Sequence, residues 1–181
     1  TVFPARPKLV PHMHVIEALS RQLTREPAPE LLIAVGSGTI NDMVKMISHL
    51  TGIPNWGIAT APSVDAYTSG KSAVRVRDYH TALPSTPSEC VVVDLDLVQA
   101  APKHMLLSGY GDLIGKYTAA FDWRLAHWVT GEPIDSFNAD FALKSAKFAF
   151  SVLADNELRS SQSIAALTDA LLTSGLIMQA S

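Results

Sequence analysis

The chain has 181 residues, of which 48% are hydrophobic and 17% charged, and this composition is typical of a globular protein rather than a disordered one. The formal net charge is -3, with no run of lysine or arginine and no apolar stretch near the about 20 residues of a membrane span, so we expect a small-molecule partner and neither nucleic acid nor a membrane. Cys90 is the only cysteine, which excludes an internal disulfide and a cysteine zinc cage and fits a reducing cytoplasm.

The first fifty residues predict a short strand, a helix and then a strand–turn–helix unit. Residues 1–3 are β-prone, and helical spacing of apolar residues begins at His12 and runs to Leu23. The apolar run from Leu31 to Val35 enters the turn Gly36-Ser37-Gly38-Thr39. Apolar residues then recur along one face of a predicted helix, at Ile40, Val44 and Ile47.

Two more buried strands and a hairpin are expected before residue 100. Trp56 to Thr60 and Cys90 to Leu95 are short apolar runs, and between them a β-hairpin is expected on either side of Arg77-Asp78. Because strands without alternation are buried on both sides, the three apolar runs predict a parallel sheet covered on both faces. Beyond about residue 100 three helices are expected, over about 103–129, 136–154 and 160–180.

The segment LLIAVGSGTINDMVKM is the strongest local motif. Glycines between a strand and a helix let a ligand approach the backbone, and the helix N-terminus offers unpaired N–H groups and a positive dipole end to a phosphate. A pyrophosphate could rest there, although the spacing is not GxGxxG and a tight turn without a ligand is the alternative. Asp42 would lie in the first helical turn, where it caps the helix or contacts a nucleotide.

The segment TAPSVDAYTS, residues 60–69, follows a predicted strand directly. Its hydroxyl groups and the carboxylate of Asp65 would lie at the carboxyl edge of the sheet, which suits a polyol or a nicotinamide ribose. A polar turn without a ligand has the same composition and is the alternative interpretation.

The segment GYGDLIGKYTAAFDWRLAHW, residues 109–128, places Asp112 in an otherwise apolar helical stretch. A buried carboxylate must pair with a cation or bind a metal, and Lys116 offers an i,i+4 ion pair as the alternative to a metal. The six histidines form no HExxH or HxxxH pair, and His104 is about 12 Å from Asp112 along a helix, too far to share an ion.

Taken together, GSGTINDMVK, TAPSVDAYTS and GDLIGKYTAAFDW resemble signature blocks of the glycerol-1-phosphate dehydrogenase family, including the bacterial enzymes of arabinose operons, within the metal-dependent (iron-containing) alcohol dehydrogenase superfamily. The resemblance runs from about residue 30 onward and implies an α/β part with a Rossmann-like parallel sheet followed by an all-helical part, as in dehydroquinate synthase or glycerol dehydrogenase. We expect a nucleotide-binding domain over 1–100, incomplete at its N-terminus, and a helical metal and substrate domain over 101–181, truncated at its C-terminus.

The resemblance implies an oxidoreductase of phospholipid metabolism that reduces dihydroxyacetone phosphate to glycerol 1-phosphate with NADH or NADPH and one divalent metal, zinc or nickel. It implies a phosphorylated small-molecule substrate, a homo-oligomer and a cytoplasmic location. By motif, Asp65 and Asp112 would be catalytic residues that contact substrate, and Asp112 would also bind the metal. The cofactor would be bound by Gly36, Gly38, Thr39, Ile40, Asn41, Asp42, Thr60, Ala61, Pro62, Ser63 and Ser69.

Two further metal ligands of the family are histidines in a motif like SGxEHxxSH, which this chain does not contain, so we expect the chain alone to lack a complete metal site and to be inactive. The first nucleotide-binding strand, and the residue that selects NAD or NADP, are expected upstream of Thr1. Two alternatives are a dehydroquinate-synthase-like lyase and a non-catalytic nucleotide-binding homologue. The segment SGKSAV, residues 69–74, resembles the substrate loop of the lyase. The third signature block argues against the lyase.

Overall fold

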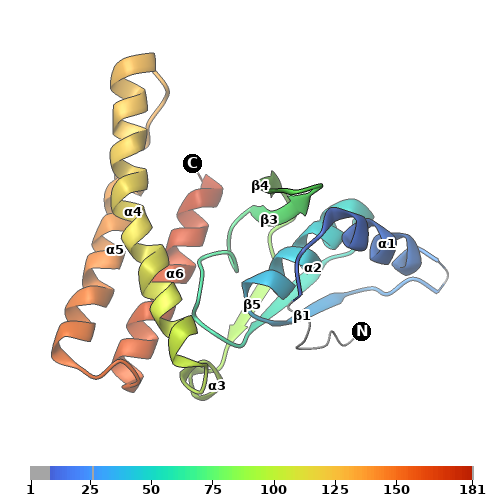
Figure 1. Ribbon diagram of the computed structural model, residues 1–181, viewed down its shortest axis with the longest axis horizontal. Coiled ribbons are helices and arrows are strands. Elements are labelled where there is room, and N and C mark those ends of the chain that lie inside the picture. The colour runs from blue at the N-terminus through green and yellow to red at the C-terminus, as the bar shows by residue number, and fades with distance from the viewer. Residues whose placement is uncertain (1–8, 26, 181) are drawn as a thin grey trace.

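The computed structural model describes residues 9–25 and 27–180 and shows an α/β part followed by a helical part, which confirms the expected fold class (Figure 1). The expected strand over residues 1–3 lies outside the described residues. The elements are α1 (Met13–Leu23), β1 (Leu32–Gly36), α2 (Gly38–Thr51), β2 (Asn55–Ala59), β3 (Lys71–Val76), β4 (Tyr79–Pro84), β5 (Cys90–Val93), α3 (Leu95–Gln99), α4 (Lys103–Thr130), α5 (Ser136–Asp155) and α6 (Ser161–Ala180).

The central sheet is parallel, with strand order β1-β2-β5, and the hairpin β3–β4 forms a separate antiparallel sheet. Parallel pairing brings the carboxyl ends of β1 and β2 to one edge, because Gly36 pairs with Ala59. The loop over residues 60–70 starts at this edge and ends at the hairpin. The glycine turn after β1 and the polar loop after β2 are therefore neighbours in space, as the order of motifs predicts.

One face of the central sheet is open in the described part of the chain, which corrects the expectation that both faces are covered. Ile33 and Val35 on β1 are 53% and 58% exposed, and Trp56 and Val92, on the same face by register, are 42% and 45% exposed. The opposite face packs on α2 and on the start of the helical part. An unbroken apolar run records that both sides of a strand are apolar, and it carries no information on which segment covers each side.

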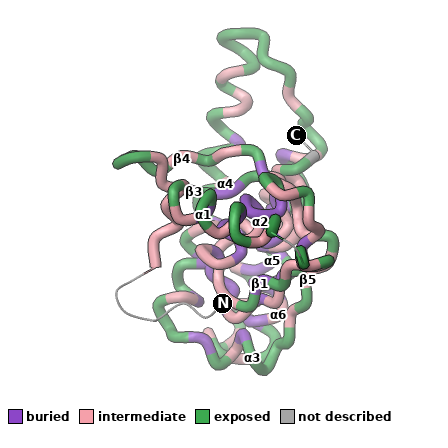
Figure 2. The backbone as a smooth tube through the Cα atoms, turned by 90° about the vertical axis from the view of Figure 1, so that its right-hand side faces the viewer, coloured by how far each residue is buried: buried purple, intermediate pink, exposed green. Residues whose placement is uncertain are grey.

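The two parts of the chain share a hydrophobic core. Ala59 and Tyr67 from the α/β part pack with Leu106 of α4 and Ile164 of α6. A second cluster joins α4, α5 and α6 around Leu167, and a third joins α1, α2 and the hairpin. The far ends of α4 and α5 extend beyond these cores and are largely exposed (Figures 1 and 2). Among the described residues, no helix combines the length and the apolar composition needed to cross a membrane.

The short helix α3 replaces the end of the third predicted strand. The side chain of Asp94 accepts hydrogen bonds from the N–H groups of Asp96 and Leu97 and so caps a helix at Leu95. The other predicted helices and strands of the described range are confirmed within a few residues at each end.

Candidate functional site

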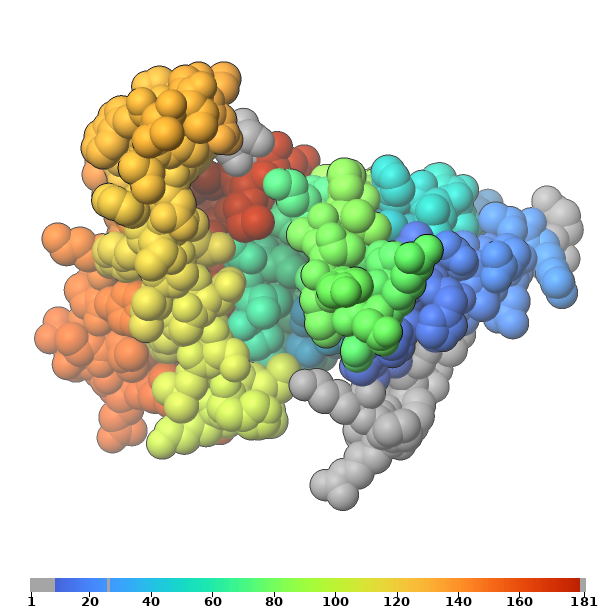
Figure 3. All heavy atoms as spheres, turned by 45° about the horizontal axis from the view of Figure 1, so that its top comes forward, coloured from blue at the N-terminus to red at the C-terminus, as the bar shows by residue number. Residues whose placement is uncertain are grey.

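A cavity of about 490 Å³ lies where the carboxyl edge of the sheet meets α4 and the hairpin. Five of the predicted site residues line it: Gly38, Thr39, Asp42, Asp65 and Asp112. In Figure 3 the hairpin (green) stands between α4 (yellow) and α1 (blue), and residues of the 60–70 loop (teal) lie below the hollow between hairpin and α4. Three segments far apart in sequence thus contribute polar groups to one cavity.

The N-terminal turn of α2 presents backbone N–H groups to this cavity. Ser37 is the N-cap in an extended conformation, its side chain makes no capping hydrogen bond, and the first turn carries no acidic residue. The first N–H groups of a helix have no intrahelical partner, so those of Gly38 and Thr39 are left for an anion. A Cβ at position 38 would lie 2.6 Å from Cγ2 of Val64, so a larger residue would force the Val64 side chain or the turn to shift.

Asp65 is buried and held by two side chains from the helical part. Its Oδ2 atom accepts hydrogen bonds from Nζ of Lys116 on α4 and, at 2.9 Å, from Oγ of Ser174 on α6. The N–H group of Asp65 donates to Oδ2 of Asp112 at 2.9 Å. The loop that follows β2 is therefore tied to both helices through a single residue.

Asp112 faces the cavity from α4 with part of its carboxylate exposed. Burial raises the pKa of Asp112 above its ordinary value, the charge of Asp65 raises it further, and the ammonium of Lys116 opposes both effects. The predicted alternative, an ion pair between Asp112 and Lys116 along the helix, is wrong, because Lys116 pairs with Asp65 across the interface instead. The second carboxylate oxygen of Asp112, Oδ1, takes no part in the hydrogen bond from the Asp65 N–H group.

Asp42 lies deeper in the cavity wall, beside a fully buried lysine. Burial raises the pKa of Asp42 to about 6, although Lys45 lies 3.3 Å from its Oδ1 atom and acts in the opposite direction. The same Oδ1 atom accepts no hydrogen bond among the described residues. Of the two predicted roles, the cap is excluded, because the α2 N-terminus lacks a side-chain cap and Asp42 pairs within the helix.

The remaining predicted cofactor residues do not line this cavity. Gly36 accepts hydrogen bonds from the Tyr67 hydroxyl and the Thr60 N–H, and the Asn41 side chain donates to the carbonyl of Ala66. Ser69 is buried in a hydrogen-bond network with Lys45. The others are Ile40, which faces an apolar groove beside β1, and the largely buried residues Ala61, Pro62 and Ser63. Their contact with a cofactor stays a prediction.

Several site residues were not predicted from the sequence. His80 on β4 lines the cavity, and so do residues 9–11, which a hydrogen bond from the Arg75 N–H to the Pro11 carbonyl holds against the hairpin. Lys116 and Ser174 orient Asp65. Lys116 was weighed only as a partner within its own helix, and no pattern in the sequence distinguishes His80 or Ser174 from surface residues.

The cavity suits part of a dinucleotide, whereas the described residues do not complete a metal site. Free N–H groups at the α2 N-terminus fit a phosphate, and the cavity volume is within the range of about 300–1,000 Å³ found for small-molecule sites. A metal ion needs about three protein ligands. Within residues 9–25 and 27–180, no three His, Cys, Asp or Glu side chains come close enough to share one. Asp112 could contribute one ligand of such a site.

Comparison with known proteins identifies the family of this chain. Residues 4–102 match the model of the iron-containing alcohol dehydrogenase family. The chain belongs to this family, which confirms the superfamily expected from the three motifs.

Several relatives with one name match most of this chain. The chain is 33% identical over 157 residues to glycerol-1-phosphate dehydrogenase (NAD(P)+) of Bacillus subtilis, covering 87% of this chain and 40% of that protein. It is 31% identical over 167 residues to the protein of that name from Pyrococcus horikoshii, covering 92% and 48%. The chain thus spans less than half the length of these relatives.

Two solved structures show the same fold. The probable glycerol dehydrogenase of Sinorhizobium meliloti superposes with a TM-score of 0.75 at 23% identity, over 94% of this chain and 51% of that one. The sulfoacetaldehyde reductase of Bifidobacterium kashiwanohense, solved in complex with NAD+, superposes with a TM-score of 0.66 at 20% identity.

Proposed function

We propose that the full-length protein is an NAD(P)-dependent glycerol-1-phosphate dehydrogenase, which reduces dihydroxyacetone phosphate to glycerol 1-phosphate. The observation that carries this proposal is the single cavity that joins the uncapped N-terminus of α2 to Asp65 and Asp112. The named relatives at 31–34% identity support the choice of substrate. No feature of the site favours the lyase, which remains an outcome of the test below.

Different residues of the site bind the cofactor and orient the substrate. The N–H groups of Gly38 and Thr39 bind a phosphate oxygen of the dinucleotide, where the helix dipole adds to the attraction. The dinucleotide, when bound, supplies the hydride. Asp65, fixed by Lys116 and Ser174, orients a hydroxyl of the substrate from the loop side of the cavity. Asp112, which lies beside Asp65, contacts the substrate from α4.

Asp112 is also proposed as one ligand of a divalent metal, zinc or nickel. Its partly exposed carboxylate faces the cavity, and an oxygen ligand of this kind suits either ion alongside imidazole ligands. The further ligands would have to come from outside residues 9–25 and 27–180, where no complete set is present. We therefore assign no catalytic step to the metal.

The proposal keeps several finer predictions from the sequence. The cofactor also contacts the turn at Gly36 and the stretch from Ile40 to Asp42, and it contacts residues 60–63 and Ser69 of the next loop. The nucleotide-binding and helical domains divide near residue 100. The protein acts as a homo-oligomer in the cytoplasm, in phospholipid metabolism.

The experiment is turnover of dihydroxyacetone phosphate by the full-length protein. Oxidation of NADH and of NADPH is followed by nicotinamide absorbance, with and without added zinc or nickel, and the stereochemistry of the product is determined. We expect glycerol 1-phosphate as the product. Turnover of the seven-carbon phosphate substrate of dehydroquinate synthase, with none of dihydroxyacetone phosphate, would establish the lyase instead.

A further inference from the structure

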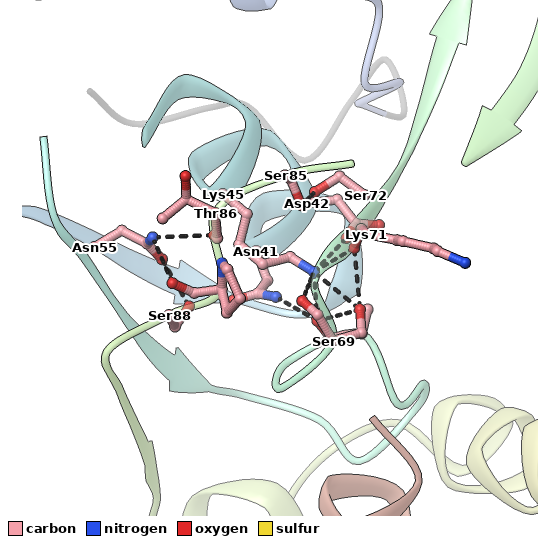
Figure 4. Close-up of polar contacts among 12 residues, drawn as sticks. Asn41, Asp42, Lys45, Asn55, Ser69, Lys71, Ser72, Ser85, Thr86 and Ser88 are labelled. Carbon is pink, nitrogen blue, oxygen red and sulfur yellow. Dashed lines mark hydrogen bonds and ion pairs between the residues drawn. The ribbon is translucent and has the colours of Figure 1, made fainter. Parts of the chain in front are cut away.

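Lys45 on α2 is completely buried, although lysine side chains in proteins are almost never fully buried. Its Nζ atom donates to three backbone carbonyls, those of Ala66 at 2.6 Å, Ser69 at 3.1 Å and Lys71 at 2.6 Å (Figure 4). The hydroxyl of Ser69 lies 3.2 Å away and is a fourth acceptor. All four acceptors belong to one turn of the chain, which leads from the polar loop into the hairpin.

The charge of Lys45 is the feature that these acceptors require. Burial lowers the pKa of Lys45, while the nearby carboxylate of Asp42 and the charge of Asp65 raise it. Carbonyl oxygens that face inward around one point repel one another unless a cation or N–H donors lie between them. The carbonyl of Ala66 accepts a second hydrogen bond, from the Asn41 side chain. Two residues of α2 that lie one helical turn apart, Asn41 and Lys45, therefore bind this turn. The ammonium group serves as an internal cation around which the turn folds.

The turn that Lys45 holds begins one residue after Asp65. The Asp65 N–H bonds to Asp112, and its carboxylate bonds to Lys116 and Ser174. The hydroxyl of Thr68, in the middle of the turn, donates to the carbonyl of Leu172 on α6 at 2.7 Å. A shift of the turn would therefore move the Asp65 carboxylate and lengthen the hydrogen bond that the Asp65 N–H group donates to the Asp112 carboxylate.

We propose that Lys45 is a positioning residue that fixes the turn at residues 66–71 on α2, so that Asp65 and Asp112 face the same cavity as the α2 N-terminus. Lys45 does not line that cavity and acts through the backbone that it binds. The consequence for catalysis rests on the proposed function, whereas the consequence for the backbone does not.

The first test replaces Lys45 with methionine, which has a similar length and no charge, in the full-length protein. We expect hydrogen exchange of the peptide that contains the Asp65 amide to accelerate about tenfold or more, because a buried charged donor is lost. We expect kcat/KM for dihydroxyacetone phosphate to fall by about tenfold to a hundredfold. Lys147→Met removes an exposed lysine from α5 and is the matched control.

The second test separates charge from volume. Lys45→Ala leaves a space of the size of propylammonium, so added n-propylammonium should restore slow exchange of the Asp65 peptide, and n-propanol of equal size should not. Equal rescue by the alcohol would show that Lys45 only fills space, and would overturn the proposal. Unchanged exchange in Lys45→Met would overturn it as well.

If both Lys45 variants fail to fold, Ser69→Ala removes one acceptor side chain and tests the same turn: faster exchange at Asp65 supports the proposal, and unchanged exchange contradicts it. If the unmodified protein does not reduce dihydroxyacetone phosphate, the proposed function fails, while the exchange measurements still decide whether Lys45 fixes the turn.

Discussion

Gly109 on α4 is the position at which an added methyl group should disturb the geometry of the site most. A Cβ at this position would lie 2.0 Å from the carbonyl oxygen of Pro62, and an ordinary contact begins near 3.4 Å, so helix and loop must separate by about 1.4 Å. The carbonyl is backbone in a buried segment and cannot rotate away as a side chain would. Asp112 follows three residues later on the same helix, so its 2.9 Å bond to the Asp65 N–H should break.

The expected loss of stability follows from these contacts. Overpacking costs about 1–3 kcal/mol and loss of a hydrogen bond to a charged group about 1.5–3 kcal/mol, while alanine gains about 1 kcal/mol over glycine in a helix. Gly109→Ala should therefore lower the free energy of unfolding by about 1.5–5 kcal/mol, and misplacement of Asp112 should reduce kcat/KM by about a hundredfold.

Gly111→Ala is the matched control, because it lies on the same helix and a Cβ there meets no atom within 4 Å. It should stabilise the protein by up to about 1 kcal/mol. Urea denaturation of both variants, with turnover measured on the same samples, makes the comparison. If Gly109→Ala unfolds at the same urea concentration as Gly111→Ala, then α4 does not pack on the loop as closely as the account requires.

Three other variants test separate parts of the site. The pKa of Asp42 is about 6 in the folded protein and 3.8 in the unfolded chain, so folding favours the protonated form, and stability falls as pH rises between these two values and is constant above them. Asp42→Asn should remove this pH dependence and raise the free energy of unfolding by up to about 3 kcal/mol at about pH 7. Chemical denaturation of both proteins at about pH 4 and about pH 7 measures the difference. If the free energy of unfolding depends on pH as strongly in the variant as in the unmodified protein, the buried carboxylate does not cost stability. Asp112→Asn in the full-length protein should lower metal content while circular dichroism stays unchanged, and full retention of metal would remove Asp112 from the ligand set. Gly38→Ala places a Cβ 2.6 Å from Val64 Cγ2, so the Kd of NADH should rise by about tenfold or more in a fluorescence titration, and an unchanged Kd would separate the turn from the cofactor.

The elements of the fold were predictable because each has a local signal. Apolar residues at helical spacing mark α1, α2 and the long helices, and short unbroken apolar runs mark the parallel strands. Helix α3 was missed because its signal is only the cap at Asp94, next to an apolar run that reads as strand. The open face around Val35 and Trp56 was missed because what covers a strand depends on segments distant in sequence.

The site was predictable where a residue follows the end of a strand. Gly38 lies in the turn that follows β1 and Asp65 in the polar loop that follows β2, and parallel strands bring such segments together. The pairings between distant segments were not predictable: Lys116 has partners both four residues away and across the interface, and only the fold decides between them. Lys45 looks like an ordinary surface residue of an amphipathic helix, yet it is the most deeply buried cation of the described chain.

The most direct test of the central claim is isotope transfer in the full-length protein. NADH or NADPH carrying two deuterium atoms at the reactive carbon of the nicotinamide is incubated with dihydroxyacetone phosphate, and the product is analysed by mass spectrometry and NMR. The account predicts deuterium on the central carbon of glycerol 1-phosphate, because the α2 N-terminus, Asp65 and Asp112 would bring the two reactants together in one cavity. Recovery of both reactants unchanged, or product without the label, would contradict it.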